Sequence, residues 1–185
     1  MCITAAILHL NKNRFMERPL QGEYNPYFDR YISLVPDGDF NEFLADNTEA
    51  TIRFFEQIPA EKHDFSYGVD KWTIKQVLMH IIDTERVMSY RAFVAARADN
   101  MVVLPTMDEN HYAANADVKD RSMAGLIDEF AAVRAATATI YAHLSDAQSK
   151  FAARGETHPF TARALGYIMI GHILHHFKVT KERYL

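Results

Sequence analysis

Apolar residues recur three or four positions apart in several long stretches of the chain, and this spacing places them on one face of a helix. The first stretch follows Asp39, which together with Glu42 resembles a helix-capping pair, and ends before Pro59, a helix breaker. Its apolar stripe consists of Phe40, Phe43, Leu44, Ile52, Phe55 and Ile58. We therefore predict a first helix between Asp39 and Pro59.

The second stretch, "KWTIKQVLMHIIDTERVMSYRAFVAARADN", has the clearest beginning. Thr73 and Gln76 have the spacing of a capping box, in which each side chain satisfies a backbone N–H of the other residue. The apolar positions that follow are Ile74, Val77, Leu78, Ile81, Ile82, Met88 and Phe93. They predict a second, long helix.

Two further helices are predicted in the second half of the chain. One begins near Ser122 and faces inward with Leu126, Ile127, Phe130, Val133, Ile140 and Leu144. The other follows Thr161 and continues almost to the C-terminus, whereas "SDAQSKFAARGETHPF" between them breaks the pattern. No stretch is convincing as a strand, so the pattern indicates an all-α fold, a four-helix bundle.

The segments between the helices refine this fold. Residues 99–121 show no sustained periodicity, and a connection of this length is typical of a crossover between the second and third helices or of part of a site. Residues 15–38 are rich in Pro, Gly, Asn and Tyr, which predicts an irregular N-terminal arm. The expected anchors of the arm on the core are Tyr24, Tyr27, Phe28 and Tyr31. The predicted organisation is an extension and arm over residues 1–38 and a bundle over 39–185, with residues 1–15 upstream of a more natural start at Met16.

Composition and charge exclude several classes of function. The 185 residues carry a formal net charge of −4 and no basic run interleaved with aromatics, which disfavours nucleic-acid binding. No apolar stretch is long enough to span a membrane, so we expect a soluble, cytoplasmic protein. The single cysteine, Cys2, provides neither a disulfide framework nor a thiolate cluster. Any metal site must therefore consist of histidines and carboxylates.

Histidines stand among the apolar positions of two predicted helices. His172 and His176 are four residues apart and share one face with Leu165, Ile168, Met169 and Val179, while His175, three residues from His172, could reach the same ion. His80 lies in the apolar run "VLMHIID" of the second helix. Three inward histidines can ligate zinc, nickel or ferrous iron and leave coordination positions open, as in a catalytic site. The other interpretation is a metal-free core with hydrogen-bonded histidines.

Other polar residues have less specific patterns. Asp83 could hydrogen-bond a ligating imidazole or act as a nearby base. Glu85 and Arg86 are typical of an ion pair on the surface or between helices. We expect His9, His63 and His143 to lie on the surface, and His111 and His158, in the two irregular connections, to be candidate substrate contacts.

The chain resembles the DinB-like (YfiT-like) family of metal-binding four-helix proteins. The resemblance rests on the His inside the second helix after a tryptophan-led capping box, on "LIDEFAAVRAATATIYAHL", and on the G-H-x-x-H-H pattern of "ALGYIMIGHILHHFKVTKERYL". It implies a bundle with the crossover between its second and third helices and one divalent metal, whose ligands fall on His80, His172 and His176. His175 is then a neighbour of the metal site.

The resemblance also implies a range of functions. Characterised relatives include transferases and isomerases that use low-molecular-weight thiols, and other members are described as metal-dependent hydrolases. Our leading hypothesis is an enzyme that activates a small thiol, or secondly water, toward a small electrophilic substrate, and that forms a homodimer. The alternative is a non-catalytic stress-response or binding module in which the metal is structural.

Overall fold

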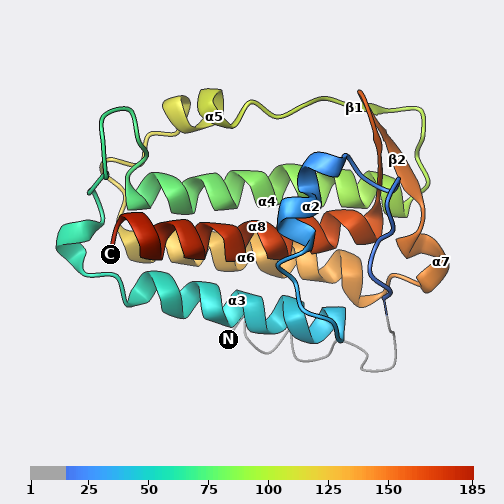
Figure 1. Cartoon of the computed structure of the whole chain (residues 1–185), viewed down its shortest axis with the longest axis horizontal. Helices are drawn as coiled ribbons and strands as arrows, with labels where there is room; N and C mark the ends of the chain where they lie inside the picture. The colour runs from blue at the N-terminus through green and yellow to red at the C-terminus, as the bar shows by residue number, and fades with distance from the viewer. Residues whose placement is uncertain (1–15) are drawn as a thin grey trace.

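In the computed structural model, which describes residues 16–185, four long helices form a bundle (Figure 1). They are α3 (Phe40–Glu56), α4 (Ile74–Ala96), α6 (Met123–Ala142) and α8 (Ala162–Arg183). The residue before each helix accepts a hydrogen bond from a backbone N–H of the first turn; these caps are Asp39, Thr73, Ser122 and Thr161. All four helices begin where the sequence predicts. The predictions for residues 1–15, including those for Cys2 and His9, lie outside the described residues.

The connection between α4 and α6 returns along the whole bundle. In Figure 1, α4 and α6 both run from left to right, and the chain between them passes back along the upper side of the view. Helix α4 packs on α6 and α8, and α3 packs on the same two helices. The four-helix bundle with a long crossover between its second and third helices is therefore confirmed. In the part of the chain that the structure describes, no helix combines the length and apolar character needed to cross a membrane.

The two irregular connections contain short regular elements that the sequence did not reveal. The crossover holds β1 (Val103–Leu104) and α5 (Glu109–Asn115), and the segment before α8 holds α7 (Asp146–Ser149), β2 (Ala152–Gly155) and β3 (Pro159–Thr161). Strand β1 pairs in parallel with β2, which pairs antiparallel with β3. The expectation of no strand was wrong here because strands of two to four residues are too short to show an alternating pattern.

The N-terminal arm is more regular than predicted. It contains the 3-10 helix η1 (Pro26–Phe28) and the single helical turn α2 (Asp29–Ile32), which packs on α8; a second 3-10 turn, η2 (Ala60–Lys62), follows α3. Of the predicted anchors, Tyr24 is buried and Phe28 and Tyr31 are partly buried. Tyr27 is 48% exposed and is not an anchor, although its ring contacts that of Phe28 edge-on.

A polar layer crosses the core between two apolar clusters at the two ends of the bundle. Glu85 and Arg134 are buried in it, with Arg134 Nε 2.8 Å from Glu85 Oε1 and Nη1 donating to Asn47 Oδ1. The predicted pairing of Glu85 with Arg86 was therefore wrong: Arg86 lies outside and pairs with other carboxylates. Phe93, predicted to face inward on α4, is 45% exposed.

Candidate metal centre

The three histidines that the family resemblance singled out meet between α4 and α8. His80 comes from α4, and His172 and His176 stand one turn apart on α8. His172 Nε2 lies 3.0 Å from His80 Nε2 and 3.0 Å from His176 Nε2. Among the His, Cys, Asp and Glu side chains of residues 16–185, these three have ligand atoms close enough together to hold one ion.

The hydrogen bonding of these rings cannot be completed by the rings alone. A neutral imidazole nitrogen carries either one proton or one lone pair, so His172 Nε2 can bond to only one of the two nitrogens that face it. One divalent ion at the usual 2.0–2.1 Å from each nitrogen would take up all the converging lone pairs at once. The donor set therefore fits a metal better than it fits a hydrogen-bonded core.

Burial fixes the charge state that ligation needs. The exposed fractions of His80, His172 and His176 are 8%, 5% and 9%. Burial lowers the pKa of His80 to about 4 and holds the pKa values of His172 and His176 well below their usual range, and the neighbouring imidazoles act in the same direction. At neutral pH all three rings are uncharged, so their lone pairs are free for a cation.

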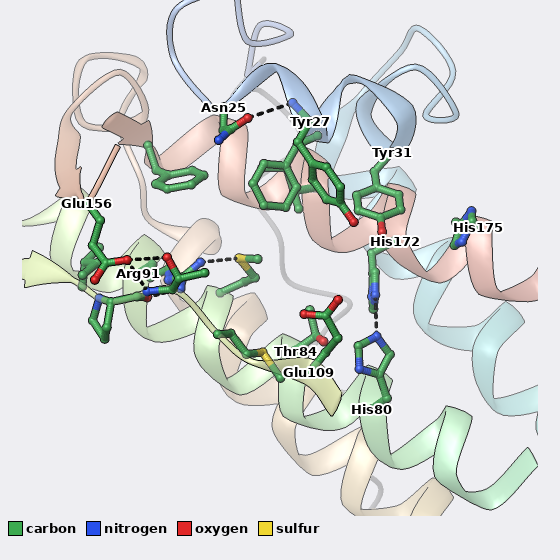
Figure 2. Close-up of a pocket in the computed structure, with 18 of the residues that line it drawn as sticks. Asn25, Tyr27, Tyr31, His80, Thr84, Arg91, Glu109, Glu156, His172 and His175 are labelled. Atoms are coloured by element: carbon green, nitrogen blue, oxygen red, sulfur yellow. Dashed lines mark hydrogen bonds between the residues drawn. The ribbon is translucent and has the colours of Figure 1, made fainter. Parts of the chain in front are cut away.

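The structure separates His176 from His175, which spacing alone leaves equivalent. His175 is half-buried and lies beside Tyr31, with ring centroids 5.4 Å apart, whereas its ring is turned away from His80 and His172 (Figure 2). Only His176 shares the group of converging nitrogens among the described residues. The difference arises because residues three and four positions along α8 leave the helix in directions about 100° apart.

Asp83 does not reach this centre. Its carboxylate lies 3.4 Å from Arg86 Nη1 on the outer side of α4, and burial raises its pKa. The Nδ1 atoms of His80 and His176 are buried without a hydrogen-bond partner among the described residues. The structure thus places Asp83 away from the position in which it would orient a ligating imidazole or serve as a base.

A pocket of about 520 Å³ adjoins the three histidines. It lies between α4, α8, the N-terminal arm and the crossover, and Figure 2 shows the histidines at one end of it. Its apolar wall includes Phe28, Met88, Leu104, Phe160 and Ile168. The centre is therefore open to a small molecule on one side.

Three charged side chains of this pocket, Arg91, Glu109 and Glu156, escaped the sequence analysis. Glu109 on α5 lines it, and Figure 2 shows its carboxylate pointing into the pocket near the histidine end. Arg91 lines the opposite end. Arg91 lies three turns after His80 and therefore on the same face of α4. This spacing is visible in the sequence and could have indicated that the two side chains line one pocket. Glu109 lies in the crossover, and no periodicity pointed to it.

Aromatic rings hold the histidines from two sides. The Trp72 ring lies 4.6 Å from that of His80, and the Tyr31 ring lies 5.3 Å edge-on from that of His172. Tyr31 can approach because residue 171 is glycine: a Cβ there would lie 2.0 Å from the Tyr31 carbonyl oxygen. The glycine before His172 thus admits the arm to the metal centre.

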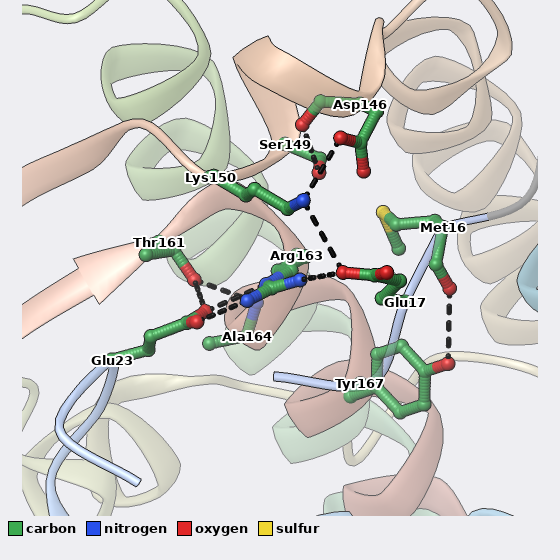
Figure 3. Close-up of polar contacts among 10 residues, drawn as sticks. All are labelled: Met16, Glu17, Glu23, Asp146, Ser149, Lys150, Thr161, Arg163, Ala164 and Tyr167. Atoms are coloured by element: carbon green, nitrogen blue, oxygen red, sulfur yellow. Dashed lines mark hydrogen bonds and ion pairs between the residues drawn. The ribbon is translucent and has the colours of Figure 1, made fainter. Parts of the chain in front are cut away.

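The arm that carries Tyr31 is tied to the start of α8 by buried charge. Figure 3 shows Arg163 between two arm carboxylates: its Nε donates to Glu23 at 2.7 Å, and its Nη1 lies 3.3 Å from Glu17. Thr161 donates its hydroxyl to Glu23 at 2.8 Å, and Lys150 pairs with Glu17 at 3.2 Å. These contacts fix the wall of the pocket that the arm supplies.

The remaining described histidines lie elsewhere. His111, on α5 rather than in an irregular loop, and His158 do not line the pocket of the three histidines. The His63 ring bonds to the carbonyl of Ile58, and His143 caps the C-terminus of α6. The expected substrate contacts at His111 and His158 are therefore not found at this pocket.

Comparison with known proteins agrees with this architecture. A family model described as the DinB superfamily matches residues 44–179. YfiT from Bacillus subtilis, described as a probable metal-dependent hydrolase with an unusual four-helix bundle topology, has a similar structure. The TM-score is 0.68 and the identity 16%, over 90% of this chain and 93% of that chain, which shows a common fold. No curated protein matches the sequence.

Proposed function

The chain belongs to the DinB superfamily, and on that premise we propose that it is a metal-dependent enzyme acting on a small electrophilic substrate. The observation that carries the proposal is the convergence of three neutral imidazole nitrogens at the end of a pocket of about 520 Å³. His80, His172 and His176 would hold one divalent ion, and zinc, nickel and ferrous iron all accept such ligands.

The ion and the residues around it have separate roles in the proposed reaction. When bound, the ion supplies Lewis-acid chemistry, which lowers the pKa of a water or thiol. We assign the acceptance of the nucleophile's proton to Glu109, because its carboxylate points into the pocket near the histidine end, whereas the candidate base suggested by the sequence, Asp83, does not line the pocket. Trp72 and Tyr31 fix the imidazole rings and narrow the access of bulk water.

Water and a small thiol are the two candidate nucleophiles. The description of YfiT as a probable metal-dependent hydrolase supports water. A low-molecular-weight thiol, which the family resemblance suggests first, stays a candidate because the pocket has room for a second small molecule beside the electrophile. Both use the same centre and the same proton acceptor.

The rival hypothesis is a non-catalytic module in which the metal only ties α4 to α8. A structural zinc site normally has all four ligands from the protein. Here three side chains converge among the described residues, and the same three line a pocket. This favours a centre with open coordination positions and a substrate beside it.

Elemental analysis of protein purified without a histidine tag tests the proposal. We expect about one divalent ion per chain in the wild type and in His175→Ala, and a loss of most of it in His172→Ala. The loaded protein is then screened with activated esters, with and without small thiols. Absence of stoichiometric metal, or equal metal in wild type and His172→Ala, would refute the proposed function.

A further inference from the structure

Arg91 differs from the other buried arginines of the described chain. Arg134 is 2.8 Å from Glu85, and Arg163 is held by Glu23. Arg91 is 6% exposed, yet no carboxylate oxygen lies within 4.0 Å of its guanidinium among residues 16–185. It is also the one of the three that lines the pocket of the metal centre.

The known contacts of Arg91 leave much of its guanidinium unused. Nη2 donates to the Pro105 carbonyl, Nη1 lies 3.6 Å from the Met88 sulfur, and the group stands 5.7 Å from the centre of the Phe160 ring. A guanidinium has five N–H donors and stays protonated. A buried charge of this kind is costly without an anion, so a ligand anion would bind here strongly.

Glu156 lies near but does not fill this role. Its carboxylate accepts hydrogen bonds from the backbone N–H of Thr106, at 3.1 Å, and from the Thr106 hydroxyl, which lowers the pKa of Glu156. These bonds hold it on the rim at the Arg91 end of the pocket (Figure 2). The guanidinium therefore remains available to a bound molecule.

The pocket follows one stripe of α4. His80, Thr84, Met88 and Arg91 all line it, at intervals of four, four and three residues. At 1.5 Å per residue, His80 and Arg91 are separated by roughly 16 Å along the helix. Between the two ends the wall is mostly apolar, with Met88 and Ile168 facing the same space.

We propose that Arg91 binds the carboxylate of an elongated substrate whose reactive group lies at the three-histidine end and whose apolar middle lies along Met88. A singly charged carboxylate suits this end better than a phosphate, because Glu109 and Glu156 also border the pocket and repel a second negative charge. The inference rests on the proposed function only in placing the reactive group of the substrate at the three histidines.

Ligands with a metal-seeking thiol at one end test both ends at once. We would measure the binding of ω-mercaptooctanoate and of the matched ω-mercaptooctanamide to Co²⁺-loaded protein by calorimetry. Wild type should bind the acid at least about tenfold more tightly than the amide. Equal affinities for acid and amide would overturn the proposal, and tighter binding of ω-mercaptooctyl phosphate than of the acid would overturn the choice of a carboxylate.

Variants then assign the preference to Arg91. Arg91→Gln should reduce the acid-over-amide ratio to about twofold or less without changing the affinity for the amide. Arg91→Lys keeps the positive charge but loses the paired donors of the guanidinium, so its acid-over-amide ratio should lie between those of wild type and Arg91→Gln. This variant tests the proposal if Arg91→Gln does not fold. The control is Arg86→Gln, an exposed arginine of α4 that does not line the pocket and should keep the full ratio. A preference that survives in Arg91→Gln would sink the assignment.

The thiolate-to-cobalt absorption band separates this inference from the proposed function. A band without an acid preference would leave the metal centre supported and remove the role of Arg91. An acid preference lost in Arg91→Gln, without a band, would support the carboxylate site and contradict the activation of thiols.

Discussion

Burial sets the proton affinity of the clustered histidines, and this links stability to pH in the metal-free protein. The unfolded chain binds a proton on His80 below about 6.5, whereas the folded chain does so only at about 4. The unfolded state therefore takes up more protons in this window, and stability falls as the pH falls. We expect His80 alone to cost roughly 2 kcal/mol at about pH 5 relative to neutral pH.

Urea unfolding of chelator-treated protein at the two pH values measures this loss. His80→Gln should remove its share of the pH dependence, because it cannot be protonated. His111→Gln, an exposed histidine outside the cluster, should keep the wild-type dependence. If the free energy of unfolding fell equally with pH in wild type and in His80→Gln, His80 would not be the source of this pH dependence.

Glu109 is the other residue whose role can be measured directly. If it accepts the proton of the nucleophile, Glu109→Gln should lower kcat/KM by about one hundredfold or more with metal content unchanged. The carboxylate of Asp83 faces Arg86 instead of the pocket, so Asp83→Asn should keep kcat/KM within about twofold of wild type. A rate loss in Asp83→Asn and none in Glu109→Gln would restore the original prediction.

At the scale of elements, the packing of the arm on α8 depends on one missing side chain. A Cβ on residue 171 would lie 2.0 Å from the Tyr31 carbonyl oxygen, so Gly171→Ala must displace α2 or α8. We expect a loss of roughly 1–3 kcal/mol in the free energy of unfolding, although alanine is the better helix former.

Urea denaturation compares this variant with Gly125→Ala in α6, where the nearest atom to the added Cβ is the Ser122 hydroxyl at 3.2 Å. The control should be neutral or slightly stabilised, since alanine favours the helix. The displaced arm should also weaken metal binding, because Tyr31 packs against His172. Wild-type stability in Gly171→Ala would show that the contact is not tight.

At the scale of the whole molecule, the three-histidine cluster joins α4 to α8, two helices far apart in sequence, and would hold the proposed ion between them. An ion that binds only the folded state stabilises it by mass action. We expect metal loading to raise the Tm by on the order of 5–10 °C over chelator-treated protein. Differential scanning calorimetry measures the shift, which His63→Gln should keep and His172→Ala should lose. A Tm insensitive to chelator would favour the metal-free interpretation.

Assembly and location also belong to this scale. The predicted homodimer stays a prediction, as does the cytoplasmic location. Sedimentation at micromolar concentration would distinguish a particle of 21.2 kDa from one of twice that mass.

Much of the fold could be predicted because its signals are local. Capping residues such as Thr73 and apolar positions at helical spacing depend only on neighbours in the chain, and all four helices follow them. The strands β1 to β3 and the turn α2 were missed because they are short and are held by contacts with distant segments. Glu85 was misassigned for the same reason, since its partner Arg134 lies on another helix.

The sequence by itself determined that His172 stands on an inward face, that His80 stands on another, and that a long crossover links the second and third helices. Helical periodicity suffices for the two histidines because it fixes the direction of each side chain relative to its own helix. The crossover follows instead from the length of the segment 99–121, which shows no periodicity. Only the tertiary structure decided that the faces meet and that Glu109 and Arg91, not Asp83, share the pocket. For His176 over His175, which helical spacing leaves open, the structure agrees with what the family resemblance implies. The physical reason is that a site between helices depends on how the helices pack and on where the crossover lies. The periodicity of a single helix contains neither kind of information.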